Sequence, residues 1–174
     1  MSTIKTTNIT HGSNSGTNNL ILDSNGNTAG PNSPAWFGKQ ATVSETDIAD
    51  QTYTQITGFS VNRTNPASGW DYAAGTFTVP TGKGGTYVIT AGVGVDDTDN
   101  DEKLILKIYK NGSGITPWTQ EYGSVSDDIL CANLHLIHPA SAGDVFSVWA
   151  WHNAGETIPT ENSRTYFGGF RLAI

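Results

Sequence analysis

The chain has 174 residues, a formal net charge of −7, and charged side chains at only 14% of its positions. Because its nine Lys and Arg residues are never clustered, binding to a nucleic-acid backbone is not expected. A single cysteine, Cys131, excludes an intrachain disulfide framework and a cysteine-rich zinc site. No apolar run approaches the roughly 18 residues of a membrane span, and residues 1–10 lack the apolar block of a signal peptide.

Small polar residues indicate the fold class. Gly, Thr, Asn and Ser together supply 71 of the 174 residues, and Thr, Val and Ile are plentiful. β-branched residues favour strands, and no stretch keeps a helical periodicity over several turns. The composition therefore predicts an all-β protein.

Residues 1–33 differ from the rest, because Ser, Thr, Asn and Gly occupy 22 of these 33 positions. Only the triplet Leu20, Ile21 and Leu22 is able to pack, and it precedes a turn signal at Asn25-Gly26. A segment of this composition does not fold on its own. We therefore expect an N-terminal arm that docks on a partner through these three apolar residues.

Residues 34–174 alternate short apolar runs with turn signals at a spacing of roughly ten residues, which is typical of a β-sandwich. The nine runs are Ala35–Val43, Tyr53–Val61, Trp70–Val79, Thr86–Val95, Lys103–Lys110, Trp118–Tyr122, Ile129–His138, Val145–His152 and Thr165–Ile174. Turn signals such as Asn111-Gly112 and Ile158-Pro159 separate them. These patterns predict one antiparallel sandwich.

Several of these runs carry apolar side chains on both faces. In Ile129–His138 the even-numbered face is apolar, yet Ile137 lies on the other face. The last run has Tyr166 and Phe170 on one face and Phe167 on the opposite one. Because a lone sandwich covers only one face of each strand, this pattern predicts a closed symmetric oligomer.

Five segments stand in a familiar order: Pro34-Ala-Trp-Phe37, Gly75-Thr-Phe-Thr-Val-Pro80 with Gly84-Gly-Thr-Tyr-Val-Ile-Thr90, Leu106-Lys-Ile-Tyr-Lys-Asn-Gly112, Leu136 through Ala142-Gly-Asp-Val-Phe146, and Tyr166-Phe-Gly-Gly-Phe-Arg-Leu172. In these segments the chain resembles the jelly-roll family of the complement C1q globular head and tumour necrosis factor. Together they span residues 34–174. The resemblance implies a jelly-roll head of about ten strands that assembles as a closed homotrimer.

We assign nine residues of these two-faced strands to the trimer interface. They are Trp36, Phe37, Cys131, Asn133, His135, Ile137, Trp149, Trp151 and Phe167. A hydrogen-bonded interface histidine is the expected role of His135, and three imidazoles around a metal on the trimer axis are the alternative.

The arm resembles the beginnings of bacteriophage tail-fibre and virion-surface proteins, in Ile9–Leu20 and then Leu22–Asn27. No collagen-like repeat and no heptad shaft separates this arm from the head. The resemblance implies a short knob on a virion surface, assembled in the host cytoplasm and released by lysis. Its arm would contact capsid or tail proteins.

One acidic loop has a pattern that suits a cation. Asp97, Asp99 and Asp101 stand at alternate positions, as at the start of a calcium loop. Glu102 stands where such a loop has its turn glycine, so a solvated acidic loop is the alternative to bound Ca²⁺. No other cofactor is expected.

The five tryptophans offer rings that can stack on sugars, and Trp118 is best placed because it follows a proline in a loop. Tyr122 and Arg164 are further candidate ligand contacts. Packing in the core or the interface is the alternative for the tryptophans, and a simple ion pair is the alternative for Arg164.

Catalytic groups are not expected. The chain has no Gly-x-Ser-x-Gly elbow. Cys131 and His135 share one face of a strand at a separation of about 13 Å, too far for a nucleophile and its base. Asp127 and Asp128 are adjacent, so their side chains point apart and do not form a glycosidase pair. The chain is therefore interpreted as a binding protein.

Three functions follow from these observations. The main hypothesis is a trimeric bacteriophage structural protein, a short fibre-type knob whose head binds a host-surface glycan or protein. The alternative is a capsid decoration or cement protein that stabilises the virion. A free lectin-like or signalling ligand is the third, and the lack of a signal peptide disfavours it.

Overall fold

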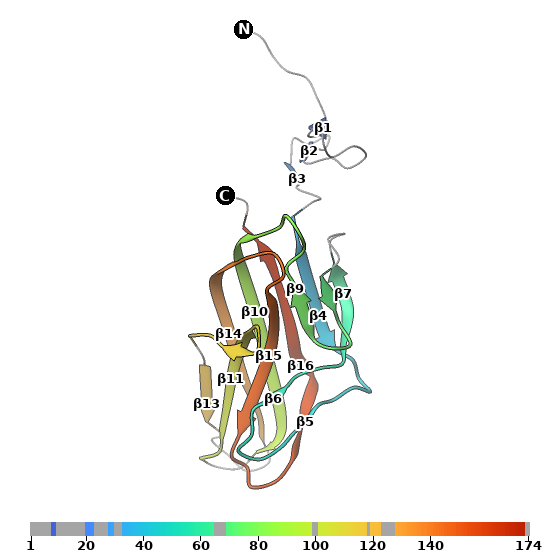
Figure 1. Cartoon of the computed structure of the whole chain (residues 1–174). Helices are drawn as coiled ribbons and strands as arrows, with labels where there is room; N and C mark the ends of the chain where they lie inside the picture. Colours follow the sequence, from blue (N-terminus) through green and yellow to red (C-terminus); the bar gives the residue numbers. More distant parts are fainter. Residues whose placement is uncertain are drawn as a thin grey trace.

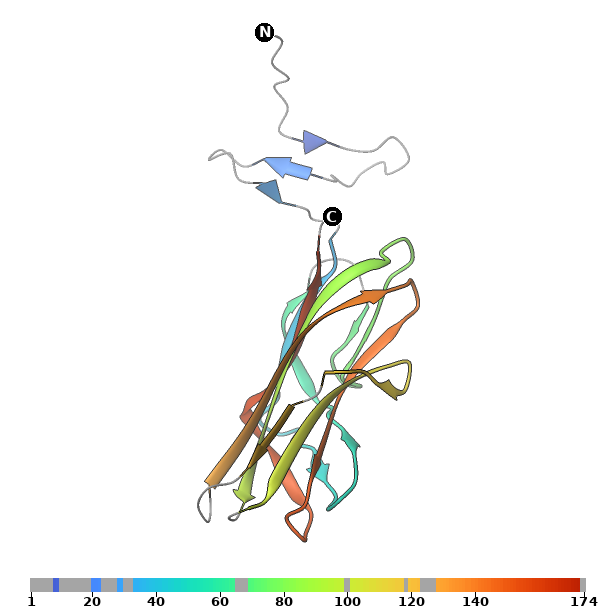
Figure 2. The same ribbon diagram turned by 90° about the vertical axis from the view of Figure 1, so that its left-hand side faces the viewer.

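The computed structural model describes residues 8–9, 20–22, 28–29, 33–64, 69–98, 101–117, 119–122 and 128–172. Within these ranges the secondary structure consists of strands joined by turns, so the predicted all-β class is confirmed. Two antiparallel sheets form a sandwich, and a small third sheet precedes them in the chain (Figures 1 and 2). The described residues hold no helix long and apolar enough to cross a membrane.

The first sheet, called sheet I, has six strands that pair antiparallel. In spatial order these are β14 (Asp128–Ala140), β10 (Gly85–Thr98), β16 (Ile158–Arg171), β4 (Ala35–Gln40) and β7 (Phe59–Thr64), with β5 (Asp47–Ile48) on β16. The pairing of β10 with β14 extends from Gly85 opposite Ala140 to Thr98 opposite Asp128. These long strands span the length of the sandwich (Figure 2).

The second sheet, called sheet II, has seven strands. In spatial order these are β12 (Ser113–Gly114), β11 (Lys103–Lys110), β15 (Val145–His152), β9 (Thr76–Thr78) and β8 (Trp70–Asp71), with β13 (Thr119–Tyr122) on β11 and β6 (Thr54–Gln55) on β15. Its outer face is turned toward the viewer in Figure 1.

The third sheet lies in the N-terminal arm and contains β1 (Asn8–Ile9), β2 (Leu20–Leu22) and β3 (Thr28–Ala29). Leu22 pairs with Thr28 in antiparallel register, as a hairpin between β2 and β3 requires. The predicted turn at Asn25-Gly26 lies outside the described residues. The predicted docking residues Leu20, Ile21 and Leu22 make up β2.

The predicted strand boundaries are met where alternation is strict and differ where a glycine or proline interrupts it. β11 and β15 coincide with the predicted runs Lys103–Lys110 and Val145–His152. Two other predicted runs are each divided into two strands. In both, a glycine adopts the left-handed region, Gly58 at φ 70° and Gly75 at φ 67°, which turns the chain within the run.

The last strand begins earlier than the sequence predicts. Pro159 reads as a break, yet β16 starts at Ile158, which pairs with Ile48 of β5. A proline is tolerated near the start of a strand, where fewer ladder hydrogen bonds are needed. A register shift between Gly92 and Gly94 on β10 then accommodates the longer strand.

The core lies between the two sheets and takes one face of each strand, as the period-2 alternation requires. The fully buried apolar residues of the three central strands are Tyr87, Ile89, Ala91, Val93, Val95, Leu104, Leu106, Ile108, Phe146, Val148 and Ala150. Trp36 of β4 stacks on Phe77 of β9 with ring centroids 3.7 Å apart, which joins the two sheets. Each large side chain buried here contributes about 1.5–3 kcal/mol.

Candidate self-association face

Three of the five large apolar side chains that are exposed in the described residues lie on the outer face of sheet I. These are Ile137, 67% exposed, Phe170, 48% exposed, and Phe37, 37% exposed. Alternation along each strand places them on the side away from the core. We call this surface the outer face of sheet I.

The strand register arranges this face in rows that run across four strands. In the first row Ile137 lies opposite Val88, Val88 opposite Phe170, and Phe170 opposite Ala35. All four side chains are apolar, and Val88 and Ala35 are half-buried. The row is therefore a continuous apolar stripe from β14 to β4.

The second row mixes polar and aromatic groups. His135 lies opposite Thr90, and the Nδ1 atom of His135 is 2.8 Å from the hydroxyl of Thr90, in a hydrogen bond. Thr90 faces Gly168, and Gly168 faces Phe37. A Cβ on Gly168 would lie only 2.7 Å from Cδ2 of Phe37, so the missing side chain lets the Phe37 ring cover the backbone.

The remaining rows are polar. Asn133, Gly92, Tyr166 and Lys39 form the third row, and the Tyr166 hydroxyl donates to Oδ1 of Asn133 at 3.0 Å. Beyond this row, Nη1 of Arg164 lies 3.8 Å from Sγ of Cys131. The face is thus apolar toward the end where β16 finishes and polar toward the opposite end of the sheet.

Five of the nine residues predicted for the trimer interface lie together on this face: Phe37, Cys131, Asn133, His135 and Ile137. Their role in an interface stays a prediction. The hydrogen bond that was expected for His135 is made within the chain, to Thr90. Cys131 and His135 share this face but contact different residues: Cys131 contacts Arg164, and His135 contacts Thr90.

Trp36 and Phe167 are corrections to that prediction. They are only 2% and 0% exposed, and they pack edge to face in the core with ring centroids 5.7 Å apart. Neighbouring residues of a strand point to opposite sides, so Trp36 and Phe37 cannot both lie on the surface. The same alternation directs Phe167 inward and Tyr166 outward.

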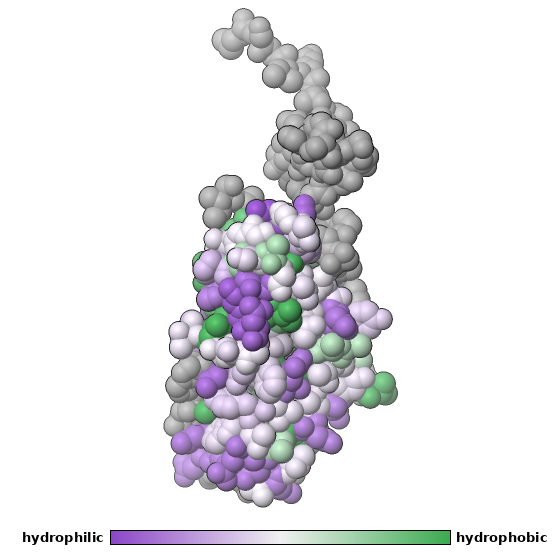
Figure 3. All heavy atoms as spheres, in the orientation of Figure 1, coloured by the Kyte–Doolittle hydropathy of each residue, from purple (hydrophilic) through white to green (hydrophobic). Residues whose placement is uncertain are grey.

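Trp149 and Trp151 stand apart from the five residues on the outer face of sheet I, and their role in an interface stays a prediction. They lie on β15 of sheet II, where Phe146, Val148 and Ala150 fill the core. By alternation both indoles stand on the outer face of sheet II, which is the face drawn in Figure 3. They therefore belong to a different surface from Ile137 and Phe37.

The predicted interface set omits three residues that the structure places on the outer face of sheet I: Val88, Tyr166 and Phe170. The available signal was the alternation of the last strand, which puts Tyr166 and Phe170 on one side. The sequence around Val88 does not indicate which way its side chain points, because a valine in a long apolar strand fits either face.

The predicted calcium site is only partly within the described residues. Asp99 and the side chain of Asp97 lie outside them, and Asp101 is an exposed turn residue at φ 67°. Among the residues that the structure describes, no group of three or more His, Cys, Asp or Glu side chains is placed to hold a metal ion. Calcium binding stays a hypothesis.

The three predicted ligand contacts are not brought together. Trp118 lies outside the described residues. Tyr122 is in β13 of sheet II, opposite Lys103. Arg164 is exposed on β16 of sheet I, beside Cys131. Tyr122 and Arg164 therefore lie on different sheets.

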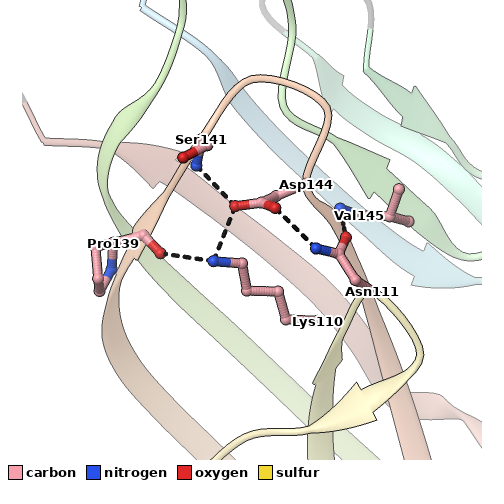
Figure 4. A network of polar contacts seen from close by, with 6 residues as sticks. All are labelled: Lys110, Asn111, Pro139, Ser141, Asp144 and Val145. Atoms are coloured by element: carbon pink, nitrogen blue, oxygen red, sulfur yellow. Dashed lines mark hydrogen bonds and ion pairs between the residues drawn. The ribbon is translucent and has the colours of Figure 1, made fainter.

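Two of the family-like segments meet in one polar network (Figure 4). The carboxylate of Asp144 lies 2.8 Å from the ammonium of Lys110, and it accepts hydrogen bonds from the Ser141 amide at 2.7 Å and the Asn111 side chain at 2.8 Å. Asn111 in turn accepts from the Val145 amide. These hydrogen bonds lower the pKa of Asp144 to about 2. The network fixes the turns after β11 and before β15, so its role is structural.

No protein-family model matches the chain, and a search of the curated proteins finds no match. Solved structures do match it. Eiger TNF from S. frugiperda has a TM-score of 0.59 at 12% identity, covering 81% of this chain and 93% of that one. The globular domain of zebrafish complement 1qA protein has a TM-score of 0.55 at 15% identity, covering 80% and 98%. Murine APRIL at pH 5.0 has a TM-score of 0.58 at 12% identity, covering 80% and 99%. The chain therefore has the jelly-roll fold of tumour necrosis factor and C1q globular domains.

Proposed function

We propose that the chain is a non-enzymatic virion-surface protein of a bacteriophage, a homotrimeric knob whose head binds the host surface. The observation that carries the association is the apolar end of the outer face of sheet I. Ile137, Val88, Phe170 and Phe37 form one surface there, and Ile137 alone is 67% exposed. Exposed apolar patches of this kind mark interaction surfaces.

A second copy of the chain is the occupant that fits this surface. Burial of apolar surface contributes about 25 cal/mol per Å² removed from water, and a symmetric assembly hides the same patch on every copy. The number three comes from the resemblance of residues 34–174 to the C1q and tumour necrosis factor family. Three copies also raise the effective concentration of weak binding sites for a host surface.

The virion setting rests on the arm. Its Ser-, Thr-, Asn- and Gly-rich composition and its likeness to phage fibre beginnings favour docking on capsid or tail proteins. In the structure, the described strands of the arm pair with one another and with no described strand of sheets I and II. This supports an attachment segment that is separate from the head.

Sedimentation of the full chain tests the association. We expect the wild type at micromolar concentration to sediment at three times the 18.5 kDa mass of one chain. Ile137→Asp and Phe170→Asp should each release folded single chains, because a charge in an apolar interface is costly. The matched control is Val43→Asp, since Val43 is 94% exposed away from this face, and it should leave the trimer intact. A wild-type single chain would overturn the proposal.

Particle assembly tests the setting. Deletion of residues 2–33 should leave a soluble trimer that no longer joins the virion, and normal incorporation would overturn the docking role of the arm. Virions without the protein should adsorb poorly and keep their heat stability. If virions without the protein adsorb normally but lose heat stability, the host-binding role is wrong and the cement role is supported.

A further inference from the structure

An aromatic cluster stands on the outer face of sheet II, opposite to the proposed association face. The rings of Tyr109 and Trp149 stack with centroids 4.6 Å apart at 25°, and the Tyr53 ring lies 6.4 Å from Tyr109. The ammonium of Lys107 lies 4.3 Å above the centre of the Tyr53 ring. We call these four residues the sheet II cluster.

The core does not require these aromatic side chains. Along β15, Phe146, Val148 and Ala150 fill the interior and are fully buried, whereas Trp149 points outward and is half-buried. A threonine, the commonest residue type of this chain, would satisfy the strand at that position. The aromatic rings are therefore additional to what folding needs.

The rings are held in place before any ligand arrives. The indole N–H of Trp149 donates to the hydroxyl of Ser147 at 2.9 Å, which fixes the ring orientation. Lys107 of β11 is the cross-strand partner of Trp149 of β15, and Tyr109 of β11 is that of Ser147 of β15. Three members of the sheet II cluster, Lys107, Tyr109 and Trp149, therefore lie side by side on two paired strands. A rigid aromatic site loses little conformational entropy on binding.

The surroundings of the cluster bear on the class of ligand. On the face drawn in Figure 3, hydrophobic areas are small and separated by neutral and hydrophilic ones. The net charge of −7 and the scattered cations disfavour a phosphate polymer. Aromatic rings beside hydrogen-bonding groups fit a sugar, whose ring has an apolar C–H face and a rim of hydroxyls.

We propose that the sheet II cluster binds a carbohydrate chain. Trp149, Tyr109 and Tyr53 offer ring surface to the C–H faces of the sugars, and Lys107 donates hydrogen bonds to their hydroxyl or carboxylate oxygens. Gln55 of β6 lies opposite Trp149, and its side-chain nitrogen donates to the Ala74 carbonyl at 2.8 Å, so its amide oxygen is the atom it offers to a sugar hydroxyl. The inference rests on the proposed host-binding role and names the ligand class and the site for it.

The position of the cluster agrees with assembly through sheet I. The outer faces of the two sheets point in opposite directions across the sandwich (Figure 2). An assembly whose three-fold axis lies at the outer face of sheet I directs sheet II away from that axis, and each such trimer presents three clusters. Weak binding at one cluster is then strengthened by simultaneous binding at the others.

The test uses the full chain on an array of neutral and acidic oligosaccharides, followed by titration with the best-retained sugar. We expect Trp149→Ala and Tyr109→Ala to lower affinity by at least about tenfold, the equivalent of 1.4 kcal/mol, and Trp149→Phe to keep part of it. The matched control is Tyr72→Ala, because Tyr72 is 49% exposed and lines a separate hollow with Phe59 and Ser44. That variant should bind as the wild type does.

A direct readout covers the case in which a variant does not fold. In the wild type, the indole N–H resonance of Trp149, assigned by its loss in Trp149→Phe, should shift on titration with the sugar. The proposal is overturned if the array retains no oligosaccharide, if this resonance does not move, or if Tyr72→Ala weakens binding equally. Sedimentation of the same samples separates the two proposals, since a trimer that binds no sugar removes only the carbohydrate site.

Discussion

The ring of Tyr166 lies directly over Gly92 on the neighbouring strand of sheet I. A Cβ at position 92 would approach Cε1 of Tyr166 to 2.3 Å and Oδ1 of Asn133 to 2.7 Å. The absence of a side chain at Gly92 is what lets the Tyr166 hydroxyl reach Asn133 at 3.0 Å. One glycine thus connects three strands of the proposed association face.

Gly92→Ala should destabilise the folded chain by about 1–3 kcal/mol, because the added methyl group displaces the Tyr166 ring and breaks its hydrogen bond. Urea unfolding of the variant and the wild type measures the difference. In a Tyr166→Ala background the same substitution should cost much less, since the clash with the ring is gone. An equal cost in both backgrounds would show that the Tyr166 ring is not the cause.

A second prediction concerns a buried hydrogen-bond network between β4 and β16. The Thr160 hydroxyl donates to Oε1 of Gln40 at 2.6 Å and accepts from the Thr46 amide at 2.8 Å. Thr160→Val keeps the shape but leaves both partners unsatisfied in the interior. We expect a loss of about 2–4 kcal/mol in urea unfolding. Thr157→Val, at an exposed position, should change stability by less than about 0.5 kcal/mol; similar losses in both would contradict the network's role.

The sequence predicts those parts of the fold that depend on local patterns. Leu104, Leu106 and Ile108 are fully buried and alternate strictly with half-buried positions, and the turn signal Asn111-Gly112 follows at once, so the bounds of β11 are predictable. Pro159 shows the limit of such reasoning. Its local signal is a break, but pairing of the preceding residue with β5, distant in sequence, extends the strand through it.

The candidate site was predicted less well than the fold, for a physical reason. Alternation separates the two faces of a strand, but it does not tell which face meets the core when both are apolar. Phe37 and Trp36 illustrate this, because only the stacking of Trp36 on Phe77 of the other sheet identifies Trp36 as the core residue. Trp149 illustrates a second difficulty, because local sequence patterns do not indicate which of the two sheets its strand joins.

A third prediction concerns acid stability. The pKa of Asp144 is about 2, lowered first by hydrogen bonding to Lys110 and then by Ser141 and Asn111. The unfolded chain binds this proton near pH 4 and the folded chain only near pH 2. The stabilisation is therefore complete above about pH 4 and is lost as the pH falls toward 2.

Asp144→Asn should cost about 1–3 kcal/mol at pH 7, because it removes the charge from these hydrogen bonds. The difference from the wild type should shrink as the pH falls from about 4 to 2, since wild-type Asp144 then becomes protonated. Urea unfolding at several pH values measures this. Lys110→Met, which keeps the Ser141 and Asn111 bonds, should retain part of the pH dependence. A difference that stays constant down to pH 2 would contradict the assignment to Asp144.

The last prediction uses His138, whose ring packs edge to face against Phe146 at a centroid distance of 6.3 Å. Burial lowers the pKa of His138, the charge of Lys110 lowers it further, and the charge of Asp144 raises it. Lys110→Met should therefore raise the pKa of His138, and Asp144→Asn should lower it. The imidazole resonances of His138 in a pH titration report both shifts.

The same lowered pKa sets the sign of a stability change near neutral pH. The unfolded chain binds a proton on His138 more tightly than the folded chain does, so stability falls as the pH drops below about 6.5. His138→Phe removes the titrating group and should flatten this part of the pH profile, while the Asp144-dependent loss below about pH 4 remains. A slope below pH 6.5 that is unchanged in His138→Phe would assign it to another group.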